Sequence, residues 1–368
     1  MAGLQRVILK GFKSIKEMDL ELRPLNILIG ANGAGKSNLV SFFKMLNEMM
    51  AIHLQQYIGT MGRAQSILHF GPKVTPRMEA RLEFEVENGI DTYALRLFHA
   101  AGDTLVFADE NLSFLQTGYT RPKSLPLGSG HEETRIGRKA DEGEPTARVF
   151  RHLLNHCRVY HFHDTSPTAR VRQYCYSGDN RWLMPDAGNL AAFLLRLREE
   201  HENIYQRIVR TVRLIAPFFA DFDLESAGPD KREIILNWRD KGSDQVFGPH
   251  QLLDGTLRAV CLVTLLMQPE GELPDPIIVD EPELGLHPYA IDVIAALFKK
   301  ASHYTQILIS TQSNLFLDNF DPEDIVVVNR EGKESKFARP DGTKLEAWLD
   351  EYSLGEVWAK NVIGGGPH

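Results

Sequence analysis

Cysteine is scarce in this chain of 368 residues, which holds only three, Cys157, Cys175 and Cys261. No two of them form a C-x-x-C pair, so the sequence excludes a disulfide scaffold and argues against a zinc knuckle. Low cysteine use fits a reducing compartment, and we expect a cytoplasmic protein. No apolar run approaches the roughly 20 residues of a membrane helix, and the charged N-terminus does not read as a signal peptide, so no membrane partner is expected.

A positive net charge is also missing, because 41 Lys and Arg stand against 49 Asp and Glu and the net charge is −8. The whole chain is therefore not a basic nucleic-acid-binding domain. The charge is uneven: residues 1–180 hold 22 basic and 19 acidic side chains, and the remainder holds 19 and 30. The densest basic stretch, Arg148–Arg172, has five arginines, four histidines and the single acid Asp164. Contact with a phosphate backbone and a plain solvated surface both fit it.

Continuous apolar runs alternate with segments of helical spacing. The runs at 25–30, 276–279 and 306–310 are typical of central strands buried on both faces, so the fold class is α/β. Alternating apolar and polar residues over 81–115 predict an antiparallel sheet attached to that core. Helices are predicted over 36–58, 189–219 and 256–267, a C-terminal helix from 346, an exposed mobile loop over 117–147, and mixed strand and loop over 148–174.

The segment Gly30–Ser37 fits the pattern G-x-x-x-x-G-K-[ST] at every fixed position, follows an apolar strand and opens a helix. In such a P-loop, backbone N–H groups and the helix N-terminus face phosphate oxygens. Lys36 is expected to reach the β- and γ-phosphates, and the Ser37 hydroxyl to bind Mg²⁺. A glycine-rich turn that binds nothing is the alternative. The predicted ATP contacts are Asn32, Gly33, Ala34, Gly35, Lys36, Ser37 and Asn38.

A second apolar strand, Pro276–Val279, is followed by the acids Asp280 and Glu281. After a good P-loop, this pattern is typical of a Walker B motif. We assign Asp280 to the Mg²⁺ shell and Glu281 to the base that polarises water for in-line attack on the γ-phosphate. Gln312 follows the strand 306–310 and is expected to orient that water or sense the phosphate, with a plain strand-to-helix connection as the alternative.

Two further segments are interpreted from their position in the chain relative to the acidic strand. Leu253-Asp254-Gly255-Thr256 precedes the acidic strand and opens an apolar helix, which is compatible with Asp254 as a simple helix cap. Gly285-Leu286-His287 follows the acids, and Pro288 after it suits the first turn of a helix, so an ordinary loop also fits.

This order of motifs resembles the ABC-type ATPase heads of the SMC/RecF superfamily, and more narrowly the stand-alone predicted ATPases of the AAA_21/AAA_15 type. The resemblance covers nearly the whole chain. It is carried by GFKSI (11–15), NGAGKSN (32–38), LDGT (253–256), DEPE (280–283), LHP (286–288), and Trp348-Leu349 with Gly364–Gly366.

The resemblance implies a P-loop NTPase of ABC-head type with a mixed central sheet, an attached antiparallel sheet and a helical lobe. The head would divide into an N-terminal part (1–184), a helical lobe ending in the signature motif (185–260) and a C-terminal part (261–368). It also implies ATP and Mg²⁺ as cofactors and a homodimer that sandwiches two ATP molecules and hydrolyses them slowly. In that dimer, Leu253–Thr256 is the signature that meets the partner's γ-phosphate, and Gly285–His287 is the D-loop.

Several positions depart from the pattern of these heads. Leu253 stands where many have serine, and Gln312 where many have histidine. There is no long coiled coil or zinc hook, which excludes an SMC-type tethering arm. The roughly 60 residues after Gln312 leave little room for a TOPRIM nuclease domain. Gln65 is a candidate for the Q-loop glutamine, with a surface glutamine as the alternative.

Three roles stay open at this point. The first is the sensor ATPase of a bacterial defence system that acts with a separate nuclease or toxin subunit. The second is a RecF/SMC-like repair or maintenance ATPase that binds DNA directly, which the stretch 148–172 motivates. The third is an ATP-bound scaffold with little hydrolysis, which Leu253 and Gln312 motivate.

Overall fold

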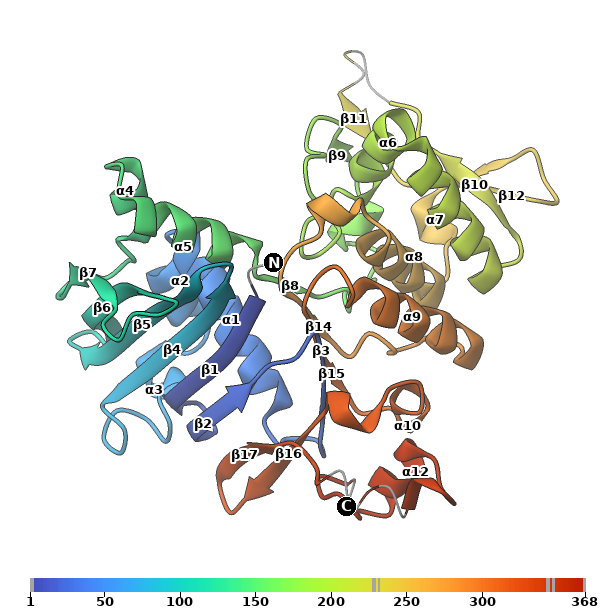
Figure 1. The fold of residues 1–368 in the computed structure, drawn as a ribbon. Coiled ribbons are helices and arrows are strands. Elements are labelled where there is room, and N and C mark those ends of the chain that lie inside the picture. The colour runs from blue at the N-terminus through green and yellow to red at the C-terminus, as the bar shows by residue number, and fades with distance from the viewer. Residues whose placement is uncertain (1–2, 227–229, 231, 342–344, 346–347, 367–368) are drawn as a thin grey trace.

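The computed structural model describes residues 3–226, 230, 232–341, 345 and 348–366. A central sheet lies between an antiparallel sheet with its helices on one side and a helical lobe on the other (Figure 1). No helix in the described ranges combines the length and the apolar character needed to cross a bilayer.

The central sheet is mixed, as the sequence predicts, with strand order β17-β16-β3-β15-β14-β8. All neighbouring pairs are parallel except β16 with β17. Leu25, Ile27 and Ile29 of β3 face one apolar core and Leu28 faces the other, which explains why the strand is apolar apart from the buried Asn26. The strands are β3 (Leu25–Ile29), β8 (Arg158–Tyr160), β14 (Ile277–Asp280), β15 (Ile307–Thr311), β16 (Ile325–Glu331) and β17 (Glu334–Ala338).

The second sheet is antiparallel throughout, with order β2-β1-β4-β5-β6-β7, and it packs against the P-loop helix. Its strands are β1 (Gly3–Phe12), β2 (Ile15–Glu21), β4 (Arg77–Val86), β5 (Gly89–Ala100), β6 (Thr104–Gln116) and β7 (Lys123–Gly128). The helices on this side are α1 (Lys36–Met50), α2 (Leu54–Thr60), α3 (Arg63–Ile67), α4 (Ile136–Asp141) and α5 (Pro145–His156). The predicted helix 36–58 is interrupted because Ile52 takes a left-handed conformation, φ 62°.

The helical lobe surrounds α8, whose buried residues join the core on the second face of the central sheet. The helix predicted over 189–219 is two helices that meet at His201. The helices on this face are α6 (Leu190–Glu200), α7 (Glu202–Ile215), α8 (Asp254–Leu266), α9 (Pro288–Ala301), α10 (Asn314–Leu317) and α12 (Leu354–Ala359). The small strands are β9 (Cys175–Tyr176), β10 (Phe219–Asp223), β11 (Glu233–Ile234), β12 (Asn237–Asp240) and β13 (Val246–Phe247). Short 3₁₀ turns cover Arg170–Arg172, Pro249–Gln251, Glu270–Glu272 and Pro322–Asp324. Residues 346 and 347 of the predicted C-terminal helix lie outside the described residues.

The prediction of a mobile loop over 117–147 is wrong, because β7, α4 and the start of α5 lie in it. The prediction of mixed strand and loop from 148 is wrong up to His156, where α5 ends. Pro145 starts α5 in the position that suits proline, and Phe150 and Leu154 are among the side chains buried along one helical face.

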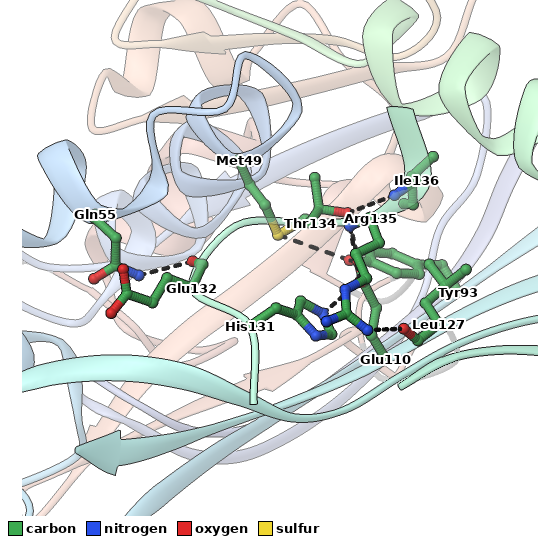
Figure 2. Close-up of polar contacts among 10 residues, drawn as sticks. All are labelled: Met49, Gln55, Tyr93, Glu110, Leu127, His131, Glu132, Thr134, Arg135 and Ile136. Carbon is green, nitrogen blue, oxygen red and sulfur yellow. Dashed lines mark hydrogen bonds and ion pairs between the residues drawn. The ribbon is translucent and has the colours of Figure 1, made fainter. Parts of the chain in front are cut away.

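A buried carboxylate explains why this segment is ordered. Glu110 on β6 is fully buried and accepts hydrogen bonds from Tyr93 Oη (2.8 Å), His131 Nε2 (2.8 Å), Thr134 Oγ1 (2.5 Å) and the Arg135 backbone N–H (3.1 Å), as Figure 2 shows. Three of these donors come from residues 131–135. A buried charge must be paired or hydrogen-bonded, so the carboxylate holds the segment against the sheet.

We expect Glu110→Ala to lower the free energy of unfolding by about 3–5 kcal/mol, since it leaves several buried donors without an acceptor. Chemical denaturation followed by circular dichroism measures the change. Glu87→Ala is the control, because Glu87 is exposed at the end of β4 and should change stability by less than about 0.5 kcal/mol. Equal stabilities of the two variants would contradict the role given to Glu110.

Candidate functional site

Three of the predicted motifs leave the central sheet side by side. β15 pairs in parallel with β3 on one side and with β14 on the other, so their carboxyl ends share one edge. Ile29 is level with Thr311, and Ser310 is level with Asp280. The P-loop, Gln312 and Glu281 therefore all begin just beyond this edge, where open α/β sheets place their ligands.

The P-loop conformation depends on glycine. Gly35 caps α1 with φ 117°, and a Cβ atom there would collide with the Ser335 hydroxyl. The first turn of α1 carries no acidic side chain and receives no side-chain cap. Its N-terminal N–H groups therefore retain the partial positive charge that attracts an anion.

Hydroxyl and amide side chains hold the P-loop in place, and we call the set Ser14, Asn38 and Ser335 the strap. Ser335 Oγ donates to the Ala34 carbonyl (2.5 Å) and contacts Ser14 Oγ (2.6 Å). Asn38 Nδ2 donates to Ser14 Oγ (2.5 Å), so the side chain of this predicted ATP contact is engaged with the strap. Sequence reasoning missed Ser335 because 300 residues separate it from the loop it supports.

Lys36 is buried and bends back onto the loop. Its Nζ donates to the carbonyls of Gly30 (2.5 Å) and Ala31 (3.3 Å). Burial lowers the pKa of Lys36, and the nearby carboxylates of Glu281 and Asp280 oppose that shift. The loop thus holds a partly desolvated cation within reach of the Walker B acids. Asn32, Gly33 and Ser37 are exposed.

The two residues predicted to be catalytic are in direct contact. Gln312 Nε2 donates a hydrogen bond to the carboxylate of Glu281. Glu281 takes a left-handed conformation, φ 44°, and its backbone N–H donates to Ser310 O (2.7 Å). Such strained non-glycine positions persist where the surrounding structure over-determines them, and they cluster at functional sites.

A further carboxylate, that of Glu283, holds Thr311 and Gln312 through hydrogen bonds. Its Oε1 accepts from Thr311 Oγ1 (2.6 Å) and from the Gln312 backbone N–H (3.3 Å). Burial raises the pKa of Glu283. Among the described residues, neither Glu283 Oε2 nor the buried Asp280 Oδ1 has a hydrogen-bond partner.

The segment after β8 borders the Walker B strand. His163 Nε2 lies 2.8 Å from the Asp280 carbonyl oxygen and donates to it, and the rings of His161 and His163 are 4.2 Å apart. Burial lowers the pKa of His161 to about 4. Gln65, the Q-loop candidate, instead lies on α3 with its amide against Gly71, so the surface alternative fits it better.

A buried arginine positions the predicted signature loop. Arg172 donates from Nη2 to Asp254 Oδ1 (2.7 Å), from Nε to the Thr165 carbonyl (2.9 Å), and also to the carbonyls of Pro249 and Leu252. Asp254 is the first residue of α8, and its charge is partnered by Arg172.

The predicted signature segment and the predicted D-loop segment pack against each other. A Cβ at Gly255 would collide with the Gly285 carbonyl, and Arg258 donates to the carbonyls of Leu284 (2.8 Å) and His163 (2.9 Å). Leu253 is 69% exposed. Of the other predicted residues here, Leu286 packs on the core, and the His287 side chain caps α9.

The arginines of the basic stretch are largely engaged within the chain. Besides Arg172, Arg151 pairs with Asp141 and Arg170 with Asp186, Arg148 donates to a backbone carbonyl, and Arg158 lies over the Trp182 ring. The stretch is therefore not a continuous set of unpartnered cations.

Comparison with known proteins identifies the fold. Residues 162–318 match the AAA_21 family model, described as an AAA domain, putative AbiEii toxin, Type IV TA system. A solved SMC head bound to the C-winged helix domain of ScpA superposes with a TM-score of 0.59 at 15% identity, covering 91% of this chain and 97% of that one. No curated protein matches the sequence.

Two archaeal structures agree with this result. An Smc head with an extended coiled coil, bound to the C-terminal domain of ScpA from Pyrococcus furiosus, has a TM-score of 0.53 at 14% identity and covers 95% of this chain and 99% of that one. An Smc head with a coiled coil and joint from Pyrococcus yayanosii has a TM-score of 0.52 at 12% identity, with the same coverage. The chain has the fold of an ABC-type SMC ATPase head.

We expect Arg172→Ala to lower the free energy of unfolding by at least about 2 kcal/mol, since it leaves buried carbonyls without donors. Arg172→Lys should recover little, because one ammonium cannot replace the forked guanidinium. Arg170→Ala is the matched control, since Arg170 forms only exposed contacts and should cost less than about 1 kcal/mol. Thermal and denaturant melts compare the variants, and a harmless Arg172→Ala would refute the role assigned to it.

Proposed function

We propose that this protein is a Mg²⁺-dependent ATP-binding and ATP-hydrolysing switch. The observation that carries the proposal is the convergence of the P-loop, Asp280-Glu281 and Gln312 at one edge of three parallel strands. The match to the AAA_21 model and the SMC-head fold support the same activity.

In this proposal, the phosphates occupy the N-terminus of α1, where Asn32–Asn38 surround them with backbone N–H groups. Lys36 exchanges its loop carbonyls for the β- and γ-phosphates, a short movement for a flexible side chain. Glu281 accepts a proton from the attacking water, and Gln312, already bonded to Glu281, orients that water.

The residues present also fit a Mg²⁺ ion. Asp280 Oδ1 is buried without a partner among the described residues, and the Ser37 hydroxyl is exposed at the start of α1. Carboxylate and hydroxyl oxygens beside substrate phosphates suit this cation. When bound, Mg²⁺ neutralises developing phosphate charge, and Ser37 and Asp280 are the residues that would hold it.

We further propose that two copies complete each other's sites. The signature loop is held against the D-loop of its own chain, and its exposed Leu253 faces solvent. Leu253 has no hydroxyl to offer to a phosphate, so the backbone N–H groups at the start of α8 supply the contact, and Arg172 neutralises the adjacent Asp254. Head-to-head dimerisation around ATP would bring this surface to the partner's γ-phosphate.

For the biological role, we favour the sensor ATPase of a bacterial defence system with a separate nuclease or toxin partner. The description of the AAA_21 family as a putative toxin of a Type IV toxin–antitoxin system supports a role in such a system, while the separate partner is our own addition. An SMC head of the same fold was solved bound to a domain of another protein. The internally engaged arginines of 148–172 weaken the alternative of direct DNA binding.

Glu281→Gln should lower the rate of ATP hydrolysis by about 10²–10⁴-fold while ATP affinity is retained, because the amide cannot accept the proton. Lys36→Ala should lose ATP affinity itself. Phosphate release and isothermal titration with Mg²⁺ separate the two effects, and chelation of Mg²⁺ should stop turnover. An unchanged rate for Glu281→Gln would show that the base assignment is wrong.

The partner is tested by affinity capture from native lysate with Glu281→Gln as bait in Mg²⁺-ATP and Lys36→Ala as the control. Sensor function predicts a stoichiometric nuclease or toxin protein bound only to the ATP-trapped bait. DNA alone, released by salt, would favour the repair role instead.

A further inference from the structure

The last described residues of the chain fold back onto the start of the P-loop. Residues 361–366, which we call the glycine turn, include three consecutive glycines, and no step of the proposed function uses them. A Cβ atom at Gly365 would lie 3.4 Å from the Gly30 Cα and 3.4 Å from the Val328 carbonyl oxygen. The backbone of the glycine turn therefore runs close beside the backbone of the P-loop, from the opposite end of the sequence.

Hydrogen bonds from neighbouring side chains fix the shape of the glycine turn. The indole Nε1 of the buried Trp358, on α12, donates to the Gly365 carbonyl (2.8 Å). The Gly366 N–H donates to Oδ1 of Asn361 (3.0 Å), and Asn361 itself is left-handed, φ 57°. Gly365 is also left-handed, φ 66°, a conformation that glycine adopts without steric cost. The turn is thus held in one place relative to the helix that precedes it.

The glycine turn and β16 both pack against Gly30. β16 pairs in parallel with β3, and Val327 is level with Ile29, so Gly30 follows beside Val328. A Cβ atom at Gly30 would collide with the Val328 carbonyl oxygen. A Cβ atom at Gly365 would lie 2.9 Å from Val327 Cγ1, which is closer than two carbon atoms pack. The absence of a side chain at both glycines is therefore what lets the turn, β16 and the P-loop meet.

The position of Gly30 affects the groups that would bind phosphate. Its carbonyl accepts the hydrogen bond from Lys36 Nζ (2.5 Å), and in the proposed function Lys36 leaves this carbonyl for the β- and γ-phosphates. Gly30 is also the residue at which β3 passes into the P-loop, so it sets the direction in which the loop leaves the sheet. A shift of Gly30 would therefore move both the cation and the loop N–H groups relative to the phosphates.

We propose that the glycine turn positions the P-loop for phosphate binding, with Gly365 and Trp358 as positioning residues that act through Gly30. This inference rests on the proposed ATP binding and adds an element outside the P-loop on which the affinity for phosphate depends. The turn contacts the first residue of the loop, so its effect is on the triphosphate. Displacing the turn should therefore weaken ATP and inorganic tripolyphosphate by the same factor.

Isothermal titration with Mg²⁺ and two probes, ATP and inorganic tripolyphosphate, tests the inference at a temperature where circular dichroism shows each variant to be folded. Gly365→Ala should weaken both probes by up to about 100-fold, because the added Cβ pushes the turn off β16 and a misplacement of about 1 Å can cost that much. Adding Val327→Ala removes the colliding Cγ1 and should restore much of the affinity, although the loss of buried apolar atoms lowers stability further.

Gly118→Ala is the matched control. Gly118 is also left-handed, φ 85°, but no atom lies within 4 Å of a Cβ added there. The control therefore carries similar backbone strain far from the P-loop, and it should bind both probes like the wild-type protein. If Gly365→Ala does not fold, Trp358→Phe takes its place, because it keeps an aromatic ring and removes only the N–H that holds the Gly365 carbonyl. It should weaken both probes in the same direction, to a smaller extent.

The outcomes separate positioning from stability and from the proposed function. A purely structural role for the turn predicts that the double variant binds no better than Gly365→Ala, so rescue by Val327→Ala supports positioning. Normal binding of both probes by Gly365→Ala, a loss confined to ATP, or an absence of rescue would overturn the inference while the phosphate site stands. If the wild-type protein binds neither probe, the proposed function itself fails.

Discussion

The parallel pairing of β3, β15 and β14 is the constraint on which the rest of this structure depends. These strands are buried on both faces, so their register is fixed by two apolar cores at once. Their carboxyl ends are then level, and three polar loops emerge together from an apolar sheet. A one-residue slip of β15 would move Gln312 away from Glu281 and would turn every side chain of the strand to the wrong core.

The residues that could be predicted from the sequence are those whose chemistry is local. Gly35 and Lys36 follow a short pattern after an apolar strand, and Glu281 directly follows another, so neighbouring residues were enough to recognise them. Ser335 and Arg172 were missed because their partners lie 301 and up to 82 residues away, and a lone serine or arginine carries no local signal. The interpretation of 117–147 as a mobile loop failed for the same reason, since the buried Glu110 that orders it precedes the segment.

The side chains that hold the loops of the site in place come from different parts of the chain, and each set holds a different loop. The β1–β2 turn links the P-loop to the loop after α3, because Ser14 contacts Ser335 and Asn38 beside the P-loop. The Lys13 carbonyl of the same turn is hydrogen-bonded to His69 Nδ1. Arg172 and Arg258 hold the predicted signature and D-loop segments through hydrogen bonds to Asp254 and to the Leu284 and His163 carbonyls. In the proposed dimer, the P-loop side of one chain would meet the signature surface of the other, and Lys36 would leave the Gly30 and Ala31 carbonyls for the bound phosphates.

The central claim is that each chain holds only half of a working site. Sedimentation velocity of Glu281→Gln, with and without Mg²⁺-ATP, tests it most directly, because this variant should bind ATP without consuming it. The account predicts a monomer that becomes a dimer when Mg²⁺-ATP is added, and a Lys36→Ala chain that stays monomeric. A Glu281→Gln chain that binds ATP and remains a monomer at all concentrations would contradict it.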